Sequence, residues 1–179
     1  MQTVREIRSS DIDLIIHYWV TADTEYLRGM GADINKLPSP DELRQMLHKQ
    51  TTQAYADKKA YCIIWELDGV PVGHCNVNKI IYGEEAYMHL HLWQAQNRRS
   101  GLGLEFVRMT LPYFFRNMKL QRLYAEPFAA NPAPNKTLAR LGFRFLKTYT
   151  TTPGSINFEQ EVNLWVLEKP DALYSIDLQ

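Results

Sequence analysis

The stretch Arg98-Arg99-Ser100-Gly101-Leu102-Gly103 decides the fold, because it joins a segment with a strand pattern to a segment with a helix pattern. Glycines have no side chain, so the backbone can curl around a phosphate while several N–H groups point at it together. The positive end of the following helix adds to this attraction, and Arg98 and Arg99 add charge at the rim. The sequence therefore predicts an anion-binding junction.

Two familiar phosphate loops do not fit this stretch. A P-loop needs a lysine and a serine or threonine after its glycines, and none follows here. The dinucleotide fingerprint needs a third glycine, and Phe106 occupies that position. A glycine turn that merely begins a helix remains the alternative, so the neighbouring segments have to decide.

The segment 84–93, before the glycines, alternates between two kinds of side chain, as a strand with two unlike faces does. One face carries polar and aromatic residues and the other only apolar ones: Tyr87, His89, His91 and Trp93 against Met88, Leu90 and Leu92. After the glycines, apolar residues recur at helical spacing from Leu104 to Met118. Pro112 is expected to kink this helix near Arg108.

The remaining segments predict further strands and helices around this junction. The predicted strands are 3–8, 60–67, 70–80, 119–126, 143–150 and 162–167, and the predicted helices begin at Ser9 or Ser10, at Ser39 or Asp41, and at about Pro132. The segment 21–38 is expected to be a surface loop. No internal repeat occurs.

The pair Asp68-Gly69 favours a two-residue type I′ hairpin, whose register would place Cys62 opposite Cys75. We expect both to be buried, reduced thiols, because cytosolic proteins rarely keep structural disulfides and neither cysteine has zinc-ligand spacing.

The bulk properties predict one domain over residues 1–179, because a chain of 179 residues with 45% hydrophobic residues can bury one substantial core. The 20 basic residues balance 20 acidic ones, so no overall field favours nucleic acid or an anionic membrane. The sequence has neither a secretory leader pattern nor a run of about 18 apolar residues, so we expect a soluble, cytoplasmic protein.

Arg98, Gly101 and Gly103 match the motif Arg-x-x-Gly-x-Gly, and Asn131 stands ahead of a short helix that ends in Leu-Gly-Phe. Together they resemble the coenzyme A pyrophosphate motif of the GNAT N-acetyltransferases, and most nearly the group of ribosomal-protein N-terminal acetyltransferases (RimJ/RimL-like). The resemblance implies a GNAT-like acyl-CoA N-acyltransferase fold of the α/β (α+β) class. Its central, mostly antiparallel twisted sheet would have about seven strands, flanked by about four helices.

The resemblance implies transfer of an acetyl group from acetyl-CoA to a primary amine by direct attack, with no metal. The acceptor would be a peptide or protein N-terminus or a small-molecule amine, and homodimerisation is left open. The expected coenzyme A contacts are Leu92, Trp93, Arg98, Arg99, Ser100, Gly101, Leu102, Gly103 and Asn131. Asn131 could equally cap its helix. The alternatives are a catalytically weak acyl-CoA-binding module of the same fold and a nucleotide-dependent enzyme.

The candidates for the general base are His89 and His91, because imidazole has a suitable pKa and both lie on the polar face. The glutamate that is frequent in the family falls at Tyr87, and either histidine could instead be structural. Glu126 is a candidate for orienting the amine. Two positions that supply an acid in relatives hold Leu138 and Pro134, so water or another group would protonate the thiolate.

Overall fold

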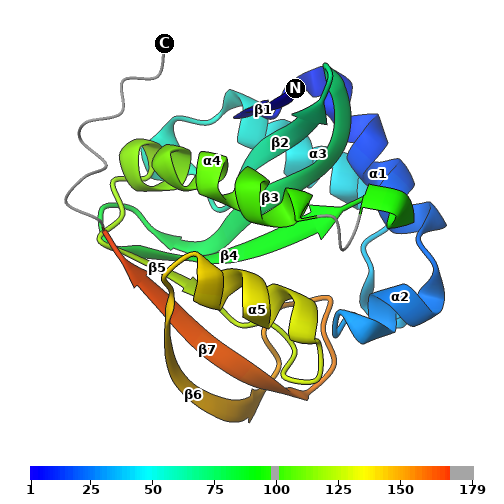
Figure 1. Ribbon diagram of the computed structural model, residues 1–179. Helices are drawn as coiled ribbons and strands as arrows, with labels where there is room; N and C mark the ends of the chain where they lie inside the picture. Colours follow the sequence, from blue (N-terminus) through cyan, green and yellow to red (C-terminus); the bar gives the residue numbers. More distant parts are fainter. Residues whose placement is uncertain (98–100, 170–179) are drawn as a thin grey trace.

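The computed structural model describes residues 1–97 and 101–169. Their strands form one sheet in the order β1-β2-β3-β4-β5-β7-β6 (Figure 1). The strands are β1 (Gln2–Glu6), β2 (Tyr61–Leu67), β3 (Val70–Ile81), β4 (Glu85–Leu92), β5 (Arg122–Ala125), β6 (Arg144–Thr151) and β7 (Gln160–Glu168). Every neighbouring pair is antiparallel except β4 and β5. The predicted, mostly antiparallel sheet of seven strands is confirmed.

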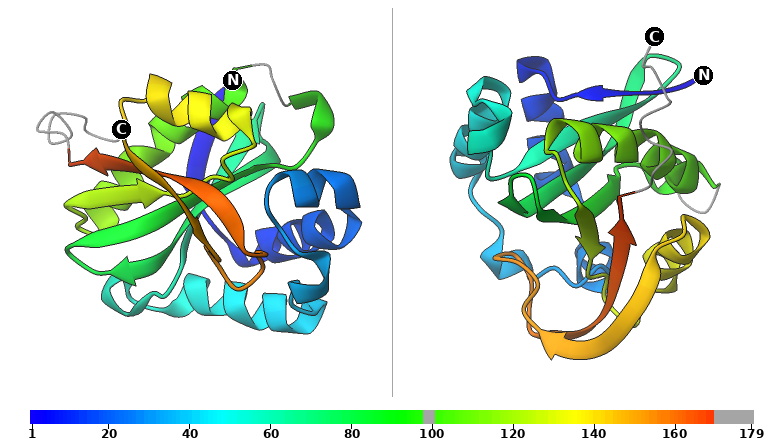
Figure 2. Two further views of the ribbon diagram at one scale, coloured as in Figure 1. Left: turned by 90° about the horizontal axis from the view of Figure 1, so that it is seen from below. Right: turned by 90° about the vertical axis from the view of Figure 1, so that its left-hand side faces the viewer.

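Helices cover both faces of this sheet (Figure 2). The helices are α1 (Ile12–Thr21), α2 (Thr24–Gly29), α3 (Pro40–Thr52), α4 (Leu102–Asn117) and α5 (Pro132–Arg140). We call the two sides the α4 face, which α5 shares, and the α1 face, which α3 shares. No helix in the described part of the chain combines the length and apolar character needed to cross a membrane.

The segment 21–38 is not the surface loop that the sequence predicts throughout, because it contains α2. Asp23 begins this helix by accepting a hydrogen bond from the main-chain N–H of Tyr26 at 2.9 Å. Leu27 is 2% exposed and fixes the helix against the core. A helix of six residues is too short to show a convincing apolar period, so sequence periodicity alone misses it.

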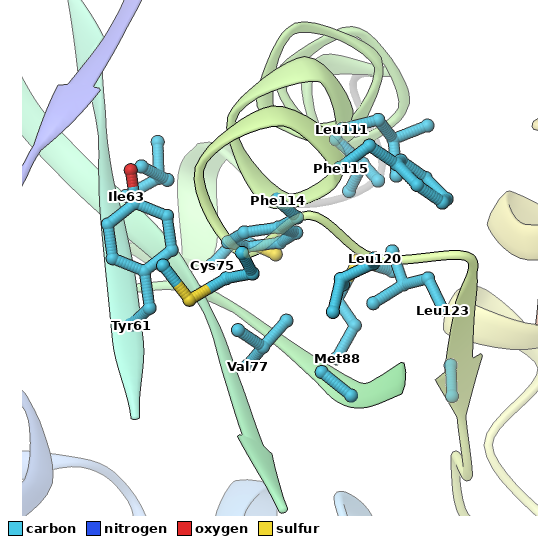
Figure 3. Close-up of a cluster of buried hydrophobic side chains, with 14 of the residues drawn as sticks. Tyr61, Ile63, Cys75, Val77, Met88, Leu111, Phe114, Phe115, Leu120 and Leu123 are labelled. Carbon is cyan, nitrogen blue, oxygen red and sulfur yellow. The ribbon is translucent and has the colours of Figure 1, made fainter. Parts of the chain in front are cut away.

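The main core lies between α4 and strands β2, β3 and β4. Figure 3 shows Phe114, Phe115 and Leu111 of α4 in one cluster with Met88 and Val77 of the sheet, and all five side chains are at most 8% exposed. Such a cluster excludes water along most of the helix. The α4 face is therefore a packed layer, which holds the start of α4 at a fixed place beside the end of β4.

One polar contact is built into this core. The rings of Trp65 and Phe106 stack at 5.1 Å, and the indole N–H of Trp65 donates to Thr110 Oγ1 at 2.9 Å. The Thr110 hydroxyl in turn donates to the carbonyl of Phe106 at 2.8 Å, so each buried polar group is satisfied. Pro112 lies inside α4, which runs as one helix from Leu102 to Asn117.

The β2–β3 hairpin confirms the predicted turn but not the predicted register. Asp68 and Gly69 both have positive φ, 52° and 79°, as a type I′ turn requires. A bulge between Trp65 and Glu66 then shifts the pairing by one residue, so Cys75 lies opposite Ile63 instead of Cys62. A one-residue shift turns side chains to opposite faces. The two cysteines are buried, free thiols in two different hydrophobic clusters.

Gly73 offers a test of how closely β3 and β4 pack near the end of β4. A Cβ at this position would lie 2.5 Å from the carbonyl oxygen of His91 and 3.3 Å from Cα of Leu92. Because both are backbone atoms that cannot rotate away, we expect Gly73→Ala to lower the free energy of unfolding by about 1–3 kcal/mol in urea denaturation.

Gly29→Ala is the matched control for this substitution. An added Cβ there meets nothing within 4 Å, and the residue is helical. The control should leave stability unchanged or raise it by up to about 1 kcal/mol. Equal stability of the two variants would contradict the close β3–β4 approach.

Candidate active site

The site begins where β4 and β5 part. The two strands pair in parallel over only three positions, Glu85 to Tyr87 on β4 against Arg122 to Tyr124 on β5. β4 nevertheless continues to Leu92, well beyond the end of β5 (Figure 1). From Met88 onwards the edge of β4 that faces β5 therefore leaves the β5 ladder. We call this interruption of the main-chain pairing between β4 and β5, from Met88 onwards, the slot.

The main chain of β4 can present N–H groups to this slot. Trp93 donates its N–H to the carbonyl of Val72 on β3 at 3.0 Å. Bonding directions alternate along an antiparallel pair, so the N–H of Leu90 points to the opposite edge, on the side of β5. Such a donor can stabilise negative charge that develops on a carbonyl oxygen.

The first turn of α4 lies next to the end of β4. Gly101 caps the helix with φ +83°, a conformation that suits glycine, and an added Cβ would meet nothing within 4 Å. A Cβ on Gly103 would meet only Leu92 Cδ1, at 3.8 Å. The backbone of this turn is thus open to close approach, while Leu102 packs against the core. Arg98, Arg99 and Ser100 lie outside the described residues.

This arrangement fits the diphosphate of coenzyme A. The helix that follows has 16 residues, and its first N–H groups and the positive end of its dipole can attract an anion. Leu92, at the end of β4, lies next to this turn, because its side chain is the group that a Cβ on Gly103 would meet. Trp93 lies on the α1 face, where it packs against the cluster formed by α1 and α3.

Asn131 begins α5 and caps it. Its Oδ1 accepts a hydrogen bond from the N–H of Ala133 at 3.3 Å, so the capping alternative is confirmed, while its contact with coenzyme A stays a prediction. Leu138 is 1% exposed and points into the core, so its position cannot supply an acid. Asn135, which sequence reasoning had not singled out, accepts from Trp165 Nε1 at 2.9 Å and ties α5 to β7.

On the α1 face, three cross-strand pairs of β3 and β4 form what we call the polar ladder: His74–His91, Asn76–His89 and Asn78–Tyr87. These side chains share one face because partners in a sheet project to the same side. The ladder brings His89 and His91 together as the sequence predicts. Across residues 1–97 and 101–169, no group of three or more histidine, cysteine, aspartate or glutamate side chains could hold a metal ion.

His91 is enclosed by aromatic rings from α1 and β3. Its ring stacks on His74 with centroids 4.7 Å apart and meets the ring of Trp19 at 5.0 Å. Its Nδ1 lies 3.3 Å from the hydroxyl oxygen of Tyr18. Burial lowers the pKa of His91 well below its ordinary value, so the imidazole is neutral at neutral pH. These contacts make His91 part of the packing between α1 and the sheet.

His89 has a different environment. It is the first residue on the α1 face beyond the β4–β5 pairing. Its Nε2 lies 3.0 Å from Asn78 Oδ1 on the neighbouring strand. Burial, reinforced by the charge of Lys79, lowers the pKa of His89 to about 4, which keeps the ring neutral at neutral pH.

Glu126 follows β5 and has both carboxylate oxygens engaged. The hydroxyl of Tyr149 donates to Oε1, and the Lys79 ammonium lies 3.4 Å from Oε2. The same ammonium lies 4.6 Å from the ring centroid of Tyr87, which stacks on Tyr124 at 5.2 Å. The side chain of Glu126 is 4% exposed, so it forms a buried negative charge in an aromatic wall beside the slot.

The loop after α2 is hydrogen-bonded to the segment that joins β6 and β7. The carbonyl of Gly31, after α2, accepts from Asn157 Nδ2 and from Gln160 Nε2, both at 2.8 Å. The N–H of Asp33 donates to the carbonyl of Ile156 at 2.7 Å. Sequence reasoning missed Asn157 and Gln160, because a side-chain bond between segments more than 100 residues apart leaves no local signal.

The chain matches a known protein family over most of its length. A family model described as "Acetyltransferase (GNAT) domain" matches residues 3–144. A search of curated proteins gave no match.

Solved structures share the fold at low identity. RimL, a ribosomal L7/L12 α-N-protein acetyltransferase in complex with coenzyme A, has TM-score 0.76 and 14% identity, covering 93% of each chain. A ribosomal-protein-S5-alanine acetyltransferase from Vibrio fischeri has TM-score 0.76 and 20% identity over 95% of this chain and 94% of its own. A spermidine N-acetyltransferase from Vibrio cholerae, with coenzyme A and spermine, has TM-score 0.74 and 17% identity over 93% and 95%.

His74 should make stability depend on pH. It is 4% exposed and accepts the indole N–H of Trp93 at Nδ1 (2.8 Å), and burial lowers its pKa to about 3 from an ordinary 6.5. The unfolded chain therefore binds more protons between pH 6.5 and about 3, so this contribution is complete above pH 6.5 and is lost as pH falls through that window.

Urea denaturation between pH 7.5 and 4.5 checks this. His74→Gln should flatten the decline in unfolding free energy by up to about 1.4 kcal/mol per pH unit, whatever its effect at pH 7.5. Parallel curves for the two proteins would show that His74 is not held neutral.

Proposed function

Because the chain belongs to the GNAT acetyltransferase family, we propose that it transfers the acetyl group of acetyl-CoA to a primary amine by direct attack. The observation that carries the proposal is the slot between β4 and β5 directly beside the first turn of α4. The start of α4 can bind the diphosphate of acetyl-CoA, and the main-chain N–H groups of β4 can bind its thioester carbonyl. Acetyl-CoA supplies the activated acetyl group.

The cosubstrate site uses backbone more than side chains. The N–H groups at Gly101, Leu102 and Gly103 bind the diphosphate, with Arg98 and Arg99 adding charge as the motif implies. The pantetheine arm enters the slot on the α4 face between Leu92 and the start of α5 at Asn131. The main chain of β4 around Leu90 then faces the thioester carbonyl.

We propose His89 as the general base. It lies on the face from which the acceptor approaches, just past the point where the strands part, and its ring is neutral at neutral pH, so one ring nitrogen has a lone pair. The acceptor R–NH3+ gives a proton to His89, and the amine nitrogen bonds to the acetyl carbon while the C–S bond breaks. The sulfur leaves with the electron pair. In sum, R–NH3+ and acetyl-CoA give R–NH–acetyl, coenzyme A thiol and one proton.

The acceptor side favours a cation. Glu126 is a buried negative charge, and the stacked rings of Tyr87 and Tyr124 offer π-faces beside it. The half-exposed Lys79 ammonium occupies this wall in the structure, and an acceptor ammonium would have to displace it. The amine belongs to a peptide or protein N-terminus or to a small molecule, the two kinds of acceptor named for the similar structures.

A catalytically weak acyl-CoA-binding module is the second candidate. One observation favours it: Leu138 is buried at a position where many relatives carry an acidic tyrosine hydroxyl. Coenzyme A thiolate is a tolerable leaving group, and a missing general acid typically costs about 10²–10⁴-fold, so turnover need not vanish.

Two measurements separate these functions. Thermal shifts with acetyl-CoA, NAD and ATP, run side by side, should show stabilisation by acetyl-CoA. Stabilisation by NAD or ATP alone would contradict the proposal. Release of coenzyme A thiol over a panel of amines and peptide N-termini should then exceed the rate without protein. Tight binding of acetyl-CoA without release on any acceptor would favour the binding module.

Gly103→Glu should separate the fold from cosubstrate binding. An acidic residue in the first turn of a helix is favourable for the helix, so thermal stability should not fall. Its charge would face the diphosphate, so the Kd for coenzyme A should rise at least about 10-fold, as measured by calorimetry. Gly103→Gln, of the same size without charge, should weaken binding less. Equal binding by all three proteins would place the diphosphate elsewhere.

The two histidines should differ when each is replaced by alanine. His89→Ala should lower kcat by about 10²-fold or more at pH 7, and by less at alkaline pH, where the acceptor is already neutral. His91→Ala should mainly lower the melting temperature, because it removes packing under Tyr18 and Trp19. Unchanged turnover of His89→Ala at pH 7 would remove His89 as the base.

A further inference from the structure

The end of β3 contains a bulge that the reaction described above does not explain. Pairing with β4 is regular up to Asn78 opposite Tyr87, and then shifts before Ile81 opposite Glu85. Lys79, inside the bulge, has φ +47°, a conformation that costs energy in a residue with a side chain. Such bulges often re-aim a side chain next to an active site.

Asn78, the residue before Lys79, makes one directed contact from this bulge. Its Oδ1 lies 3.0 Å from Nε2 of His89, diagonally across the polar ladder. A carbonyl oxygen can only accept, so Nε2 of His89 must carry the hydrogen and donate it. A neutral imidazole has a single ring hydrogen, so its Nδ1 is then the basic nitrogen with a lone pair.

We propose that Asn78 is a positioning residue for the acetyl transfer: it fixes His89 in the Nε2–H tautomer and so leaves Nδ1 to accept the proton of the acceptor ammonium. The inference rests on the proposed role of His89 as base. Asn78 touches neither substrate, and it acts through His89 alone. A partner that sets the tautomer in this way is a general device for histidine bases.

None of the charged and titratable groups described next orients the ring of His89 in place of Asn78. Lys79 on β3 is positive and disfavours a second proton on the ring. Its own ammonium is directed to Glu126 and Tyr87, away from a hydrogen bond with His89. His74 and His91 on the same ladder have lowered pKa values and are neutral at neutral pH. Neither supplies the carboxylate that often orients a histidine base.

Asn76 provides the matched control. It is on the same strand and the same face, directly opposite His89 in the register, but the ring N–H of His89 donates to Asn78 and not to Asn76. Removing either amide changes the face of the sheet by a similar amount. Only Asn78→Ala removes the acceptor for Nε2–H.

The first experiment measures the tautomer without any substrate. Two-bond 1H–15N correlation spectra of histidine-labelled full-length protein at pH 7 should show His89 with the hydrogen on Nε2. Asn78→Ala should give a mixture of tautomers, and Asn76→Ala should keep the original pattern. A hydrogen on Nδ1 in the unsubstituted protein, or an unchanged pattern in Asn78→Ala, would overturn the proposal.

The second experiment measures kinetics with one acceptor amine throughout, so its own ionisation cancels between variants. Asn78→Ala should lower kcat by about 10–100-fold with little change in KM for acetyl-CoA, the usual cost of losing a partner that orients a reactive group. Asn76→Ala should retain kcat. Asn78→Asp still accepts from Nε2–H but adds a negative charge, which favours the imidazolium.

The pH profile of Asn78→Asp distinguishes positioning from mere structural support. The acidic limb of kcat/KM should move up by about one pH unit or more, and kcat above that limb should recover relative to Asn78→Ala. A limb that stays in place with equal losses in all Asn78 variants would show a structural role. If the tautomer changes as expected but His89→Ala keeps full activity, the base assignment fails, and the catalytic role of Asn78 with it.

Discussion

The short parallel pairing between β4 and β5 is the constraint on which the rest of the structure depends. Only Glu85 to Tyr87 pair with β5, yet β4 must continue to reach the glycine junction before α4. The sheet therefore opens beyond Tyr87 instead of closing into a continuous ladder. An antiparallel hairpin in this place would have paired these main-chain groups along its whole length, and the slot would not exist.

In the proposed function, the two faces of the sheet have different roles: the α4 face binds the cosubstrate and the α1 face binds the amine. On the α4 face, the cluster around Phe114 and Phe115 holds the first turn of α4 against the end of β4, which fixes the proposed diphosphate site relative to the slot. On the α1 face, His89 and the wall around Glu126 form the side from which we propose that the amine approaches. In the proposed reaction, donor and acceptor meet where the two strands part, so the sheet would contribute to catalysis by orienting them.

Sequence reasoning predicts the parts of this design that repeat at regular spacing. The two unlike faces of β4, the glycine junction and the type I′ turn all follow from local pattern. The bulge at Trp65 and the short helix α2 do not, because each depends on packing with distant residues. The same limit applies at the site: sequence places His89 and His91 on one face, but only the contacts with Asn78 and Tyr18 distinguish them.

Hydrogen exchange of the full-length protein with and without saturating acetyl-CoA tests the central claim most directly, because it reports where main-chain N–H groups become protected. The account predicts slower exchange in two segments at once, residues 88–92 of β4 and the first turn of α4 from Leu102. Protection confined to other segments, with these two unchanged under saturation, would contradict the claim that the cosubstrate binds where β4 and β5 part.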